Sequence, residues 1–125
     1  MNRNTFITEI TRLMQNTLRL NQKVQEHGIP SLEEEVFDLD DGDFTRGLCF
    51  VIDGAAAGII EEYFSNKISF IKDKYTRLYK TILKRAVLGI QAQEKNNILV
   101  HVLLSYAGLP QKEQRNIEYV LLSDV

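Results

Sequence analysis

The stretch GLCFVIDGAAAGIIEEYF, residues 47–64, is almost continuously apolar and is crossed by one aspartate before its final turn. Its apolar part, from Leu48 to Ile60, is thirteen residues long. A membrane-spanning helix needs about twenty apolar residues, so this length favours a core helix over a membrane span. We predict one helix that is capped by Asp43 and continues to about Phe64.

Two glycines give this predicted helix a distinctive face. Gly54 and Gly58 are four residues apart and would lie on the same side of a helix. Glycine inside a helix costs about 1 kcal/mol relative to alanine, so the pair predicts a close contact with a bulky neighbour. We favour a contact within the chain, and self-association through these glycines is the alternative. Asp53 is expected on the polar edge, paired with Arg46 or a lysine.

The first segment of the chain carries an apolar seam with alternating steps of four and three residues, which is typical of an amphipathic helix. The seam comprises Phe6, Ile10, Leu13, Thr17, Leu20 and Val24. Asn4 or Thr5 can cap the start of this helix. Gly28 can end it in a left-handed conformation.

A short acidic helix is predicted over residues 31–38, because Ser31 and Glu34 have the spacing of a capping box. After the central stretch, Ser65 and Asn66 indicate a break or a new helix cap.

Three further segments complete the predicted architecture. Residues 67–90 have the pattern of a long amphipathic helix, and residues 98–108 are apolar on all sides, as in a central helix. Pro110 is suited to the first turn of a last helix. We therefore predict a single all-α domain over residues 1–125, a compact bundle of about five long helices plus one short acidic helix.

Charge is distributed unevenly, although the net charge is only −2. Residues 31–66 contain ten acidic side chains and one basic one, whereas residues 67–93 contain seven basic side chains and one acidic one. Two interpretations are open. The acidic segment can lie along the basic helix and form surface ion pairs within the chain, or one of the two blocks can face a partner.

The chain lacks the patterns of export and of disulfide-rich proteins. Cys49 is the single cysteine and has no internal partner for a disulfide. No apolar run of signal-peptide length begins the sequence. We therefore expect a cytoplasmic protein.

The common catalytic and metal-binding motifs are also missing. An EF-hand loop that starts at Asp38 fails at three of five characteristic positions. The single cysteine and the two distant histidines do not have zinc-ligand spacing, and His101 is expected to be buried in the core. The sequence has no nucleophile elbow and no glycine-rich phosphate loop. We predict that the chain is not an enzyme and binds no cofactor or metal.

These exclusions favour a protein–protein interaction module, such as an adaptor, an inhibitor or an oligomeric scaffold. Its candidate partner surface is acidic and comprises Glu33, Glu34, Glu35, Asp38, Asp40, Asp41 and Asp43. The alternative is a nucleic-acid-associated regulator that uses the basic helix over residues 67–85. Its candidate residues are Lys72, Arg77, Lys80 and Lys84. The expected partner is a protein or a second copy of the chain, with nucleic acid less favoured and no membrane.

Overall fold

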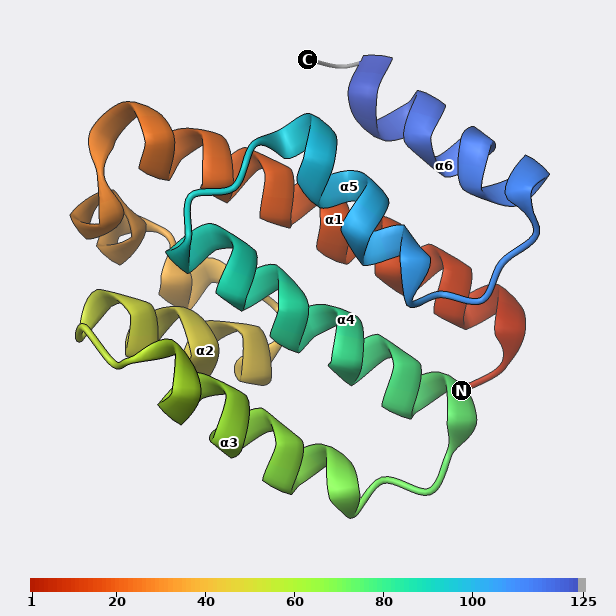
Figure 1. The fold of residues 1–125 in the computed structure, drawn as a ribbon, viewed down its shortest axis with the longest axis horizontal. Helices are drawn as coiled ribbons and strands as arrows, with labels where there is room; N and C mark the ends of the chain where they lie inside the picture. The colour runs from red at the N-terminus through yellow and green to blue at the C-terminus, as the bar shows by residue number, and fades with distance from the viewer. Residues whose placement is uncertain (124–125) are drawn as a thin grey trace.

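A computed structural model describes residues 1–123 as an all-α fold (Figure 1). Its α-helices are α1 (Arg3–His27), α2 (Gly42–Ile52), α3 (Ala57–Ser69), α4 (Lys74–Gln91), α5 (Asn96–Ser105) and α6 (Gln111–Ser123). Two short 3₁₀ helices, η1 (Ile29–Glu34) and η2 (Val36–Asp38), connect α1 to α2. The predicted fold class is confirmed, and no β-strand occurs within residues 1–123.

Helix α4 runs through the middle of the bundle, where it packs against α1, α2, α3 and α5 (Figure 1). Helix α6 lies at the edge, against α1 and α5. The buried apolar residues of all six helices join in one cluster. Within the described part of the chain, none of the helices has the length and apolar content needed to cross a bilayer.

Helix α1 follows the predicted seam, and all six seam residues are buried. The predicted cap is wrong by a few residues, because the side chain of Asn2 accepts a hydrogen bond from the backbone N–H of Thr5 at 2.8 Å. Asn4 lies inside the first turn instead. Gly28 ends the helix as predicted, with a φ of 86° that glycine adopts readily.

Residues 29–38 form two 3₁₀ helices instead of the predicted short α-helix over residues 31–38. The predicted capping box is not formed, because the Ser31 hydroxyl donates to the carbonyl of Gly28 at 2.6 Å. Leu32 and Val36 are both buried. These two apolar anchors, rather than local capping, therefore decide the path of the segment.

The predicted single helix over residues 43–64 is wrong, because a turn separates α2 from α3. Gly54 has a left-handed φ of 79°. Its N–H donates to the carbonyl of Val51 at 3.1 Å, and the N–H of Ala55 donates to the carbonyl of Phe50 at 2.9 Å. These two bonds form the Schellman motif that ends many helices.

Two aspartates lie at the ends of α2. Asp41 caps the helix in place of the predicted Asp43, since its carboxylate accepts hydrogen bonds from the N–H groups of Asp43 and Phe44. Asp53 follows the last residue of α2 and is exposed. It makes no ion pair with Arg46 or with any lysine of residues 1–123, so the predicted pairing is wrong.

The boundary between α3 and α4 also differs from the prediction. Ser65 and Asn66 lie inside α3, and the break comes at residues 70–73. Asp73 caps α4 by accepting a hydrogen bond from the N–H of Thr76 at 2.9 Å. This cap therefore fixes the residue at which the central helix begins.

The two C-terminal helices follow their predicted order. The apolar segment over residues 98–108 forms most of α5, and α6 begins directly after Pro110. His101 is exposed rather than buried, and its Nδ1 lies 3.1 Å from Oε1 of Glu118 on α6. The apolar sequence around His101 does not bury it, because one side of α5 faces solvent.

The close helix contacts occur at two glycines that the sequence did not single out. A Cβ on Gly47 would lie 2.8 Å from Val87 and 2.9 Å from Phe64. A Cβ on Gly89 would lie 2.6 Å from Leu99. These distances are shorter than van der Waals contact, so glycine allows α2 to approach α4 and α4 to approach α5.

Candidate functional site

The acidic surface predicted from the sequence divides into paired and unpaired carboxylates. Asp41 belongs to the paired group, since its Oδ2 accepts a hydrogen bond from the Tyr79 hydroxyl at 2.7 Å and lies 3.6 Å from Nζ of Lys80. Burial raises the pKa of Tyr79 far above its ordinary value, and the hydrogen bond to Asp41 adds to the effect. Tyr79 therefore remains a neutral donor, and Asp41 ties the start of α2 to α4.

Asp43 pairs with two lysines from different helices. Its Oδ1 lies 2.6 Å from Nζ of Lys67 on α3, and its Oδ2 lies 2.9 Å from Nζ of Lys80 on α4. Burial raises the pKa of Asp43, but hydrogen bonds and charge from the two lysines outweigh it, so the pKa lies below its ordinary value. Asp43 thus joins three helices of its own chain.

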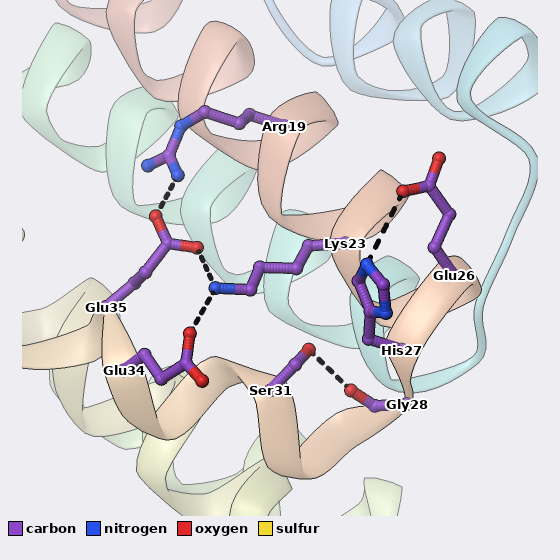
Figure 2. Close-up of polar contacts among 8 residues, drawn as sticks. All are labelled: Arg19, Lys23, Glu26, His27, Gly28, Ser31, Glu34 and Glu35. Atoms are coloured by element: carbon purple, nitrogen blue, oxygen red, sulfur yellow. Dashed lines mark hydrogen bonds and ion pairs between the residues drawn. The ribbon is translucent and has the colours of Figure 1, made fainter.

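Glu34 and Glu35 face the last turns of α1 (Figure 2). Lys23 lies 2.9 Å from Glu34 and 3.0 Å from Glu35, and Arg19 contacts Glu35 as well. The hydrogen bond from Lys23 is the main cause that lowers the pKa of Glu35. Glu35 is therefore held by ion pairs to α1, whereas the side chain of Glu34 remains 75% exposed.

The remaining carboxylates are close in sequence to an exposed aromatic ring. Glu33, Asp38 and Asp40 are exposed and make no ion pair with any residue in the described range 1–123. Phe37 lies between them in the sequence and is 81% exposed. We define the Phe37 face as Glu33, Phe37, Asp38 and Asp40.

A second phenylalanine is exposed in the turn between α3 and α4. Phe70 is 85% exposed, and Lys72 and Lys74 beside it are exposed too. We define the Phe70 tip as Phe70, Lys72 and Lys74. Neither aromatic ring was predicted from the sequence to be exposed, although each lies outside the apolar seams of the helices and next to charged residues.

The basic residues of the nucleic-acid alternative are mostly engaged within the chain. Arg77 donates two hydrogen bonds to backbone carbonyls at the end of α3 and just after it. Lys80 pairs with the aspartates described above, and Lys84 lies 2.8 Å from Glu61. Lys72 lies in the turn rather than on α4 and makes no ion pair with residues 1–123. The predicted continuous basic helix over residues 67–85 is therefore not formed.

Gly54 and Gly58 do not form the predicted strip. Gly54 lies in the turn after α2, and Gly58 lies in the first turn of α3, so they share no helix face. Nothing lies within 4 Å of a Cβ placed on either residue. The prediction fails because Gly54 ends a helix instead of continuing one.

A hollow of about 320 Å³ lies beside the Asp41 network, between α1, the loop before α2, and α4. Its charged and polar lining includes Glu9, Arg12, Asp40, Asp41, Tyr79 and Lys80. Its size is at the lower end of the range for ligand pockets, but several lining groups already satisfy one another. Among residues 1–123, no three His, Cys, Asp or Glu side chains are grouped to hold a metal ion.

The structure therefore defines an all-α chain whose charged residues largely pair with one another, leaving two exposed aromatic patches of opposite charge. No protein-family model, curated protein or solved structure matches this chain.

Proposed function

We propose that this chain is a protein–protein interaction module without catalytic function, and that its partner binds the Phe37 face. The proposal is supported above all by the 81% exposure of Phe37 among carboxylates with no ion-pair partner in residues 1–123. The surface is narrower than the one predicted from sequence. It leaves out Glu34, Glu35, Asp41 and Asp43, which pair within the chain.

The energetics of this arrangement suit a binding surface. Removing a phenylalanine side chain from water stabilises a complex by about 1.5–3 kcal/mol. Aromatic residues often dominate binding energy when charged residues surround them and exclude water. The carboxylates of the Phe37 face raise the association rate of a basic partner and disfavour an acidic one.

The partner proposed on these grounds is a protein segment that carries lysine or arginine beside an apolar side chain. Its basic groups would meet Glu33, Asp38 and Asp40, and its apolar group would cover the ring of Phe37. The chain would then act as an adaptor, an inhibitor or a scaffold, in the cytoplasm under this proposal.

The test uses a synthetic peptide in which two phenylalanines are each flanked by lysines. Titrating it into the ¹⁵N-labelled chain should shift the amide signals of residues 33–40, and the shifts should weaken as salt increases. Phe37→Ser should lower the association constant about tenfold, which corresponds to the loss of an aromatic contact. Circular dichroism should stay unchanged, because the ring is exposed.

A matched pair of charge reversals provides the control. Glu33→Lys/Asp38→Lys should abolish binding of the peptide, whereas Asp53→Lys/Glu62→Lys makes the same charge change at exposed sites on another part of the surface and should leave binding intact. Unchanged binding by the first variant, or signal changes that avoid residues 33–40, would overturn the proposal.

A further inference from the structure

We infer that the partner of the Phe37 face is a second copy of this chain, which docks through its Phe70 tip. The inference rests on the proposed function, because it names the partner of the same face. It assigns a role to the two most exposed large apolar side chains of the described residues, Phe37 at 81% and Phe70 at 85%.

The Phe70 tip has the composition of a basic docking element. Lys72 and Lys74 are exposed and form no ion pair within residues 1–123. Asp73, the acidic residue between them, is already engaged. Its Oδ2 lies 3.3 Å from the N-terminal amine and accepts hydrogen bonds from the N–H and the hydroxyl of Thr76 at 2.9 and 2.6 Å. The free charge at the tip is therefore positive.

The two patches are complementary in both charge and apolar content. Docking the tip on the face places lysine ammonium groups near carboxylates and brings the two phenylalanine rings into contact. An ammonium group can also lie over an aromatic face, and this cation–π contact is favourable. Face-to-face or tip-to-tip contacts would instead bring like charges together. Docking of the face on the tip is therefore favoured over face-to-face or tip-to-tip contact.

Within one chain the two rings do not cover each other, because Phe37 is 81% and Phe70 is 85% exposed. Contact between Arg19 and Glu35 places the segment before Phe37 beside the second half of α1. The ion pair between the N-terminus and Asp73 places the tip beside the start of α1, as Figure 1 also shows. Each patch therefore remains free for another molecule, and face-to-tip contacts form a twofold dimer, a ring or an open chain.

Sedimentation equilibrium of the full chain tests the inference. Each patch is small, so association should be weak and should appear as a weight-average mass that rises with concentration at low salt. High salt should return the mass to that of the monomer. Phe37→Ser and Phe70→Ser should each lower the association constant about tenfold.

Charge-reversed variants separate face-to-tip docking from other modes. Glu33→Lys/Asp38→Lys and Lys72→Glu/Lys74→Glu should each be monomeric alone, because each presents two like-charged patches. Their equimolar mixture should associate, because each basic patch again meets an acidic one. Lys95→Glu/Lys112→Glu makes the same charge change as the tip variant at exposed lysines elsewhere, and it should self-associate like the wild type.

The outcomes distinguish this inference from the proposed function. A wild-type chain that stays monomeric while the lysine–phenylalanine peptide still binds residues 33–40 would overturn the inference and leave the proposed function standing. A monomeric mixture of the two reversed variants would overturn it as well. Binding of the monomer to phosphatidylserine vesicles, lost in Lys72→Glu/Lys74→Glu, would assign the tip to a membrane surface instead.

Discussion

The hydroxyl of Tyr79 donates a 2.7 Å hydrogen bond to one carboxylate oxygen of Asp41, while the other oxygen of Asp41 accepts hydrogen bonds from the first turn of α2. A single side chain thus caps one helix and satisfies a buried hydroxyl of another. This arrangement removes Asp41 from the surface available to a partner. It also explains how an acidic segment can be largely structural.

The shared role of Asp41 predicts a large loss on its removal. Asp41→Ala should lower the free energy of unfolding by about 2–4 kcal/mol, since a lost cap and an unsatisfied buried hydroxyl add together. Tyr79→Phe should lower it by only about 1 kcal/mol. Urea denaturation of both variants and of the double variant measures the coupling. Equal losses in the two single variants would contradict the shared role.

The ion pairs of Asp43 predict a stability that depends on pH. The folded pKa of Asp43 lies below its ordinary value, so its contribution is complete above the unfolded value of about 3.9 and is lost as the pH falls through the folded pKa. Asp43→Asn should therefore be less stable than the wild type at neutral pH, with a difference that shrinks in acid. Urea midpoints of the wild type and the variant, at neutral pH and in acid, measure this difference in stability. Asp53→Asn, at an exposed site without an ion pair in residues 1–123, is the control.

The glycine contacts predict opposite effects for two alanine substitutions. Gly47→Ala should lower the free energy of unfolding by about 1–3 kcal/mol, because its Cβ would collide with Val87 and Phe64 in a packed core. Gly58→Ala meets nothing within 4 Å and should stabilise α3 by up to about 1 kcal/mol. Thermal unfolding of both variants measures these two changes in stability. A destabilised Gly58→Ala would show a contact at that site that the structure lacks.

Asn21 is a buried polar residue, and its hydrogen bonds are expected to stabilise the fold. Its Nδ2 donates to the carbonyl of Glu94 at 2.5 Å and to Oδ1 of Asn96 at 2.8 Å. Asn21→Ala should lower the free energy of unfolding by about 1–3 kcal/mol, because buried acceptors lose their donor. Hydrogen exchange in the first turn of α5 should speed up. Gln25→Ala, which removes an exposed hydrogen bond to the same carbonyl of Glu94, should change stability by less than about 0.5 kcal/mol.

Much of the fold could be predicted where the evidence was local. The seam runs from Phe6 to Val24 within the 25 residues of α1, and every seam residue is buried as expected. The predicted single helix over residues 43–64 was wrong because Gly54 is compatible with both a helix interior and a helix end. Only the hydrogen bonds around it show that α2 stops there. Glycine disfavours a helix interior by about 1 kcal/mol and readily adopts the left-handed φ of 79° found at Gly54, as the end of a helix requires.

The candidate site could be predicted only in part. The acidic block was visible, but the pairs that neutralise half of it join residues 11 to 39 positions apart, such as Lys23 with Glu34 and Asp41 with Lys80. Such pairs depend on how the helices meet. Phe37 and Phe70 are two of six phenylalanines, and composition cannot say which of them remain in water.

The sequence by itself determined the all-α class, the order of most helices and the buried face of α1, because helical periodicity depends only on residues that are close in the sequence. The tertiary structure decided which charges are paired, which glycines lie in close contacts and which aromatic rings face solvent. The physical reason is that burial and ion pairing depend on distances between helices, and those distances exist only once the chain has packed.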